Sequence, residues 1–221
     1  MIDTFLTAYD PSDLPGTSID PLGFDRGYNY LADRILPGLT NVAAHPRYLA
    51  LICAGIHLAG SPGEIVLREQ IRRRQESILR LERFWALANV LARPDDSNAV
   101  RGVTYAQARV NEILDSSLQR TDANYPFLSR QAQYGAIGIY GNVAHGMRFL
   151  DRAELHLSPA LGEAAAEAFI LETEMPISIQ RAIRDDADVS VTTLKSWGDR
   201  AHVLGEVCRR EAECVSEALH A

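Results

Sequence analysis

Cysteine is scarce in this chain, and its spacing supports no metal chemistry. The 221 residues include three cysteines, which is too few for a disulfide framework. Cys208 and Cys214 lie six residues apart in a helical pattern, so they fall on different faces, which is not a metal-ligand spacing. The six histidines form no His-Glu-x-x-His motif. We therefore predict no metal and no cofactor, and we expect the reducing compartment of the cytoplasm.

Long apolar runs are also missing. The longest run extends from Tyr48 to Ala59 and contains His57, whereas a helix that crosses a bilayer needs ~20 residues. The first residues have neither a basic cluster nor a long apolar core, so they do not form a signal peptide. We expect a protein with no membrane attachment.

Basic charge is not in excess. The formal net charge is −7, and a general nucleic-acid binder usually has a basic balance. With 47% hydrophobic and 23% charged residues, the composition is that of an ordinary globular domain. The length fits one large domain or two small ones. We predict a single domain over residues 1–221, with lobes 1–125 and 126–221 as the alternative.

Helix signals dominate the chain and predict an all-α fold of about seven to nine helices. Asp20-Pro21 starts a helix in which Phe24, Tyr28, Leu31 and Ile35 form one apolar face. The segment 46–60 is apolar nearly all round, which predicts a central buried helix, and Gly55 within it allows a neighbour to approach closely. Ser61-Pro62-Gly63-Glu64 is a capping box for a helix that runs to Ala92. Further helices are expected near residues 104–118, 128–150, 159–174, 176–185 and 199–218.

The stretch 128–150 is unusually rich in glycine for a helix, with Gly135, Gly138 and Gly141 at every third position. Each glycine disfavours a helix by roughly 1 kcal/mol relative to alanine, so tertiary contacts must recover that loss. We expect close packing, in which Gly135, Gly138 and Tyr140 allow a close approach to a neighbouring helix at the centre of the fold. The alternative is that bare backbone amides face a ligand or a partner. The spacing does not match a dinucleotide-binding loop.

Arginines gather on the long helix 62–92, where glutamates interleave with them. Mixed-sign faces of this kind are usually solvated, and the alternative is a surface that binds a partner or phosphate. Arg74 falls in the apolar seam and must be paired if it is buried. The candidates for binding a partner or phosphate are Arg47, Arg68, Arg72, Arg73, Arg74, Arg80 and Arg83, together with Arg130 and Arg148 beside the glycine-rich stretch.

Residues 126–175 are similar to part of a winged-helix module. Alternation over Glu154–Leu157 permits a short strand, and Ser158-Pro159 starts the next helix, as in the segment that follows a winged-helix recognition helix. This resemblance implies one short β-hairpin and, as a second hypothesis, DNA binding. Only Arg130 and Arg148 are available for phosphate contacts, so we expect this module to bind DNA weakly if it binds it at all.

Several short motifs along residues 20–141 stand out together. They are Asp20-Pro21-Leu22-Gly23-Phe24, Leu36-Pro37-Gly38-Leu39-Thr40-Asn41, Pro46-Arg47-Tyr48-Leu49, Arg101-Gly102-Val103-Thr104 and Gly135-Ala136-Ile137-Gly138-Ile139-Tyr140-Gly141. This set resembles uncharacterised helical proteins encoded in bacterial anti-phage defence neighbourhoods. The resemblance implies a companion subunit that works with an ATPase or nuclease, and relatives that are longer, so that this chain would be a truncated or N-terminal portion. It supplies no catalytic residues.

Three functional hypotheses follow. The first is a non-catalytic recognition subunit of a defence complex, whose partners are other protein subunits and whose surface includes the arginine-bearing helix and the Arg47-Tyr48 neighbourhood. The second is the winged-helix DNA binder. The third is an enzyme without a recognisable motif, since Walker A and G-x-S-x-G sequences are absent. The observation that would support it is a pocket in which a histidine, a carboxylate and an arginine lie together. Its candidate histidines are His45, His57 and His145.

Overall fold

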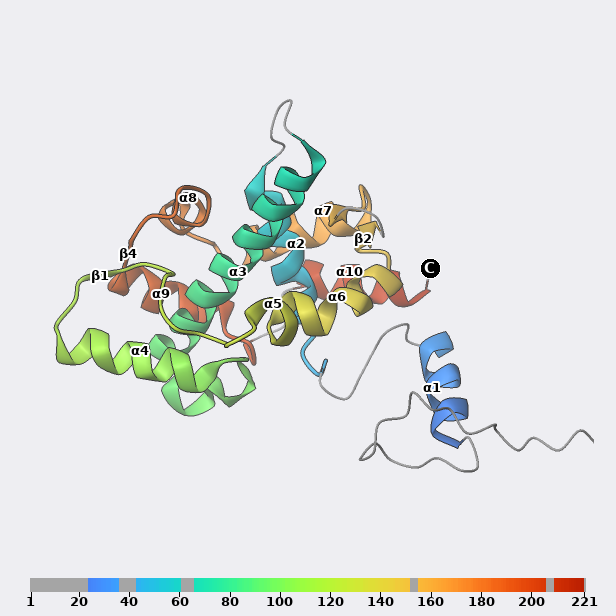
Figure 1. Ribbon diagram of the computed structural model, residues 1–221, viewed down its shortest axis with the longest axis horizontal. Coiled ribbons are helices and arrows are strands. Elements are labelled where there is room, and N and C mark those ends of the chain that lie inside the picture. The colour runs from blue at the N-terminus through green and yellow to red at the C-terminus, as the bar shows by residue number, and fades with distance from the viewer. Residues whose placement is uncertain (1–23, 36–42, 61–65, 152–154, 206–208, 221) are drawn as a thin grey trace, which may run out of the picture.

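The computed structural model describes residues 24–35, 43–60, 66–151, 155–205 and 209–220 (Figure 1). These ranges contain ten α-helices, one short 3₁₀ helix and two sheets of two short strands each, so the mainly helical class is confirmed, with more helices than expected. None of the helices within them is long and apolar enough to cross a membrane. In chain order the elements are α1 (Phe24–Ile35), α2 (Arg47–Ala59), α3 (Leu67–Ala92), η1 (Pro94–Ala99), α4 (Val103–Asp115), β1 (Arg120–Thr121), α5 (Gln131–Tyr134), α6 (Ala136–Gly146), β2 (Leu150–Asp151), β3 (His156–Leu157), α7 (Leu161–Glu172), α8 (Ile177–Asp185), β4 (Val189–Ser190), α9 (Val191–Ala201) and α10 (Arg209–His220).

Helix α2 forms the centre of the fold, as its apolar sequence predicted. Figure 1 shows it with α3, α6, α7 and α10 around it. Tyr48 is buried between Trp85 of α3, which it meets edge-on, and Tyr140 of α6, on which it stacks. Gly55 faces α3 so closely that an added Cβ would lie 2.8 Å from the Ile78 Cα. All residues of α2 except His57 and Ala59 are buried, which explains why its sequence is apolar nearly all round.

Helix α3 is the longest element, and its two halves have different surroundings. The half from Ile78 onward is buried and packs against α2 and α9, whereas the first turns are largely exposed. The helix ends at Ala92 as predicted, because Pro94 begins η1 and cannot continue an α-helix. The capping box at residues 61–64 lies outside the described residues.

The glycine-rich stretch is broken, which corrects the expectation of one helix over residues 128–150. Gly135 is extended (φ −87°, ψ −164°) and separates α5 from α6. At Gly138 an added Cβ would overlap the Gln133 carbonyl of α5, so this glycine permits the turn between the two helices. Gly141 departs from the expected close packing, since an added Cβ would only meet the Ile137 Cγ1 at 3.9 Å.

We expect the Gly138→Leu variant to lose about 1–3 kcal/mol of unfolding free energy. The added side chain would force apart the α5 backbone and the start of α6. Gly141→Ala is the matched control, and we expect it to be neutral or to gain up to ~1 kcal/mol from helix propensity. Urea denaturation of both variants measures the difference. Equal stability of Gly138→Leu and the wild type would contradict the steric account.

Two short antiparallel pairs complete the fold. Strands β2 and β3 form the predicted hairpin, with Leu150 opposite Leu157. Strands β1 and β4 form a second pair that was not predicted, with Thr121 opposite Val189. Each of these strands has two residues, which is too short for an alternating pattern to be visible in the sequence.

Candidate functional site

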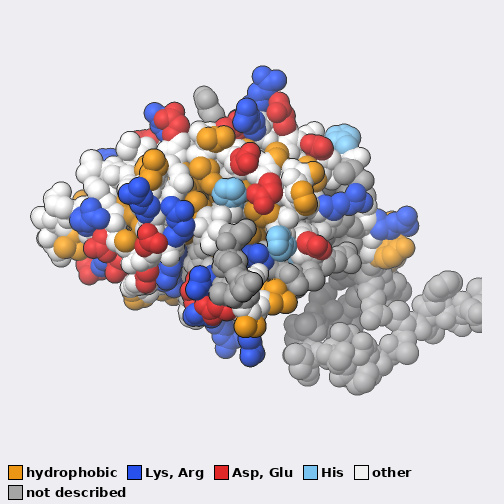
Figure 2. Space-filling view, turned by 90° about the horizontal axis from the view of Figure 1, so that it is seen from above, with side chains coloured by type: hydrophobic (Ala, Val, Ile, Leu, Met, Phe, Trp, Pro, Cys, Tyr) orange, Lys and Arg blue, Asp and Glu red, His pale blue; other side chains and the backbone are white. Residues whose placement is uncertain are grey.

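The exposed arginines of α3 form ion pairs along their own helix. Arg72 lies 2.8 Å from Glu69 and 3.0 Å from Glu76, and Arg73 lies 3.3 Å from Glu69. Exposed pairs of this kind contribute little to stability, because water and salt screen them. Figure 2 shows acidic and basic side chains intermixed over the face that it displays. The N-terminal half of α3 is therefore a mixed-charge surface, and Arg68 is exposed at its beginning.

The arginines further along α3 connect it to other elements. Arg80 donates to the Ile183 carbonyl oxygen at 3.1 Å and pairs with Asp186 at the end of α8. Arg83 donates to the Gln131 side-chain oxygen at 2.7 Å and to the Ala123 carbonyl oxygen at 2.8 Å. Arg74 is buried. Arg80 and Arg83 therefore connect α3 to other elements, and Arg80 also lines one surface hollow together with Arg72 and Arg73.

Arg130 and Arg148 lie at opposite ends of the α5–α6 segment, and both are exposed. Helix α6 buries Tyr140 and Val143 and packs against α2, so its most apolar residues are unavailable to a DNA groove. DNA binding through this segment stays a prediction, and it rests on these two arginines.

The carboxyl group of Glu82, a buried residue of α3, lies at the N-terminal end of α6. Its side chain accepts hydrogen bonds from Gln131 Nε2 at 2.8 Å and from the Ala136 amide at 2.7 Å. The first amide of α6 therefore faces a carboxylate of the same chain. Glu82 follows Ile78 by four residues and precedes Trp85 by three, which places it on the buried face of α3. This spacing could have predicted from the sequence that Glu82 is buried.

Burial raises the pKa of Glu82 to about 7, although its hydrogen bonds to Gln131 and Ala136 oppose the shift. The folded state therefore binds this proton more tightly than the unfolded state, where a glutamate titrates near ~4.3. We expect the contribution of Glu82 to stability to be complete below that value and to be lost as pH rises to about 7. Urea denaturation across this window measures the loss, and the Glu82→Gln variant should remove that part of the pH dependence. An unchanged pH profile in the variant would contradict the assignment.

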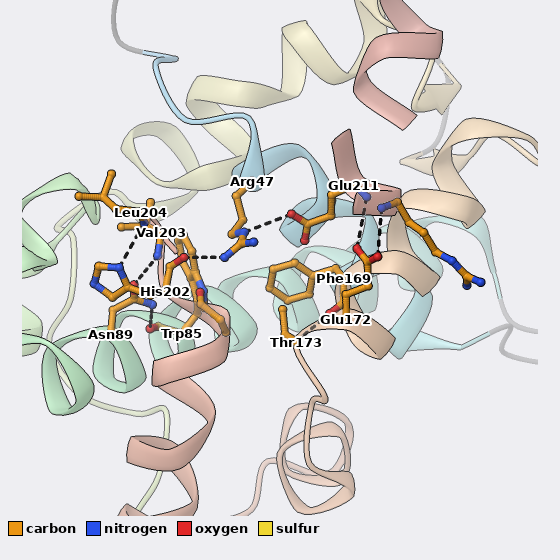
Figure 3. A network of polar contacts seen from close by, with 12 residues as sticks. Arg47, Trp85, Asn89, Phe169, Glu172, Thr173, His202, Val203, Leu204 and Glu211 are labelled. Atoms are coloured by element: carbon orange, nitrogen blue, oxygen red, sulfur yellow. Dashed lines mark hydrogen bonds and ion pairs between the residues drawn. The ribbon is translucent and has the colours of Figure 1, made fainter. Parts of the chain in front are cut away.

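Arg47 occupies an enclosed polar site at the start of α2 (Figure 3). It is the first residue of α2 and is buried. Its Nε donates to Glu211 Oε2 of α10 at 3.1 Å, and its Nη1 donates to the His202 carbonyl oxygen at 2.5 Å. Burial raises the pKa of Glu211, and the charge of Arg47 opposes that shift. One guanidinium group thus joins α2 to two points of the C-terminal region.

A second set of hydrogen bonds fixes the turn after α9. The Trp85 indole N–H donates to the Ala201 carbonyl oxygen at 2.5 Å, and the Val203 amide donates to the Asn89 side-chain oxygen at 2.8 Å. His202 is fully buried, its Nδ1 accepts from the Leu204 amide, and burial lowers its pKa. Figure 3 shows this set beside Arg47. No sequence signal indicates the bonds of Trp85 and Asn89, because they join α3 to a segment 114–116 residues later in the chain.

An apolar groove of about 330 Å³ lies between the start of α2 and α10. Arg47 and Glu211 line it together with His45, so the groove contains the histidine, carboxylate and arginine that the enzyme hypothesis requires. Arg47 and Glu211 bind each other, however, and within the described residues the His45 ring makes no hydrogen bond to either. The enzyme hypothesis stays a prediction. The remaining wall is mainly apolar, with Ala50, Val203, Ala212, Val215 and Leu219.

Comparison of the chain with protein-family models, curated proteins and solved structures gives no match. In the part of the chain that the structure describes, no cluster of three or more His, Cys, Asp or Glu side chains could hold a metal ion. Any functional assignment must therefore come from the surfaces described above.

Proposed function

We propose that the protein is a non-catalytic subunit of a bacterial anti-phage defence complex, which binds an ATPase or nuclease partner through the first turns of α3. The observation that carries this proposal is an exposed aliphatic surface beside arginines. Val66 is 76% exposed and Leu67 is 42% exposed, and both lie next to Arg68 and Arg72. Arginine is enriched at protein interfaces, and exposed aliphatic groups beside it supply the apolar contact area that association needs.

The charges on this surface favour a protein partner over nucleic acid. Glu69 and Glu76 pair with Arg72 and Arg73 along the helix, so both signs are presented side by side. A phosphate backbone would meet these carboxylates as well as the arginines. A protein surface with complementary alternating charges can match both, which gives the contact specificity. The defence setting rests on the sequence resemblance.

Co-purification with the ATPase or nuclease encoded beside the gene tests the proposal. We expect Leu67→Asp and Arg72→Glu each to weaken binding at least tenfold, about 1.4 kcal/mol. Leu67→Asp should leave the melting temperature unchanged, whereas Arg72→Glu should lower it slightly, because it loses the ion pairs with Glu69 and Glu76. Leu114→Asp on α4 and Arg130→Glu just before α5 are matched controls, because both residues are exposed and lie away from α3 in the sequence. A protein that binds no neighbour-encoded subunit, or equal losses in the control variants, would contradict the proposal.

A further inference from the structure

The groove between α2 and α10 has the size of a site for a small molecule. Its volume of about 330 Å³ lies at the lower end of the ~300–1,000 Å³ that is typical of such sites. One wall comes from the start of α2 and from the turn after α9. The facing wall is one side of α10, because the residues that line it follow at helical spacing: Glu211, Ala212, Val215, Ser216 and Leu219.

The wall opposite α10 is held in place by contacts of its own. Ala50 belongs to the buried helix α2. In the turn after α9, the Val203 amide donates to the Asn89 side-chain oxygen at 2.8 Å, and the preceding carbonyl group, that of His202, accepts from Arg47. These bonds fix this wall without a ligand, and a site that is formed before binding loses less conformational freedom when a ligand enters.

Among the described residues that line the groove, Glu211 has an acceptor atom that is not satisfied. The residue is 6% exposed. Its Oε2 accepts a hydrogen bond from Arg47, whereas its Oε1 is buried without a hydrogen-bond partner. A buried acceptor without a donor is destabilising, and more so when it is charged. Because Glu211 is part of the groove wall, a molecule bound in the groove can supply the missing donor.

The charges around Glu211 favour a neutral donor. Arg47 lies 3.1 Å from the Glu211 carboxylate, so the two groups neutralise each other. Glu172 of α7 accepts from the backbone amides of Arg210 and Glu211 (Figure 3), where the N-terminal end of α10 offsets its charge. A cationic ligand at Oε1 would lie close to the Arg47 guanidinium, and an anionic ligand would meet the Glu211 carboxylate. Either ligand would add an uncompensated charge to a buried pair.

We propose that this groove binds a small, neutral, largely apolar molecule whose N–H or O–H group donates to Glu211 Oε1. The apolar body of the ligand packs against Ala50, Val203 and Val215, which removes it from water. The hydrogen bond to Glu211 fixes its orientation, as single polar groups do in apolar sites. The residues that line the groove do not include the first turns of α3, so this inference can fail without affecting the proposed function.

An NMR titration of the isotope-labelled chain with indole tests the proposal, because indole is neutral, mostly apolar and carries one N–H donor. Benzofuran is the matched probe, since an oxygen replaces the N–H group in a ring system of the same shape. We expect indole to shift the amide signals of Ala50, Val203 and Val215 and to bind at least tenfold more tightly than benzofuran. No binding of indole at millimolar concentration, equal affinity for the two probes, or tighter binding of the anion indole-3-acetate would overturn the proposal.

Variants of the groove locate the binding site. Ala212→Phe fills the groove from an exposed position of α10, so it should abolish indole binding and leave the melting temperature unchanged. Glu217→Phe is the matched control, because Glu217 is exposed on the opposite face of α10, and it should bind indole like the wild type. The double variant Arg47→Met/Glu211→Leu removes the acceptor together with its cation, so it should bind indole and benzofuran equally. Indole binding that survives Ala212→Phe, or a preference for indole that survives the double variant, would contradict the assigned site.

Discussion

Replacing Gly198 with alanine is expected to lower the free energy of unfolding by about 1–3 kcal/mol, and leucine should lower it further. Gly198 lies where α9 crosses α3, and an added Cβ would overlap the Ala88 carbonyl group and lie 2.9 Å from the Ala92 Cβ. Backbone atoms line this contact, so relief requires the two helices to move apart. Because α3 and α9 share an extensive interface, that separation would loosen buried side chains along it.

Thermal and urea denaturation of Gly198→Ala measure this loss. Gly27→Ala in α1 is the control, because a Cβ at that position meets nothing within 4 Å; we expect no loss there, and a gain of up to ~1 kcal/mol from helix propensity. If Gly198→Ala unfolds at the same urea concentration as the wild type, the close approach of α3 and α9 is not required for stability.

The second large effect is expected for Arg47→Ala, which should destabilise the protein by about 3–5 kcal/mol. The substitution leaves the Glu211 carboxylate buried without its cation and removes the donor from the His202 carbonyl oxygen. Protonation of Glu211 would relieve the first defect, so the loss should be smaller at acidic pH than at alkaline pH. Urea denaturation at both pH values measures this difference.

The double variant Arg47→Met/Glu211→Leu separates the charge from the packing. It removes both members of the pair and replaces them with apolar groups, so it should be more stable than Arg47→Ala alone. Together with the single variants Arg47→Met and Glu211→Leu it forms a double-mutant cycle, and the departure from additivity gives the coupling between the two side chains. Additive losses from the two sites would show that the buried pair does not act as a unit.

Much of the fold is readable from local patterns. The apolar segment 46–60 predicted the buried α2, the proline at position 94 predicted the end of α3, and the Leu155–Pro159 segment predicted the β2–β3 hairpin. Each of these signals depends on residues close together in the chain. The break at Gly135 was not predicted, because it depends on Glu82, a residue more than fifty positions away.

The candidate sites were less predictable for the same reason. Arg72 and Arg73 have glutamates three or four residues away, so their pairing within α3 is readable from the sequence. Arg80 and Arg83 bind distant carbonyl groups, which no local spacing indicates. The partner of Arg47 is 164 residues away. A single sequence contains no signal for such pairings, because burial and ion pairing are decided by helices that meet only in the folded chain.

The hydrogen bonds of Figure 3 also constrain the order in which the molecule can fold. The Trp85 indole binds a carbonyl group 116 residues later in the chain, and Arg47 binds a carboxylate 164 residues later. Contacts of such large sequence separation slow folding. During synthesis, α2 and α3 would emerge with these polar groups unmatched, and the Arg47–Glu211 contact would form only after the residues of α10 had left the ribosome.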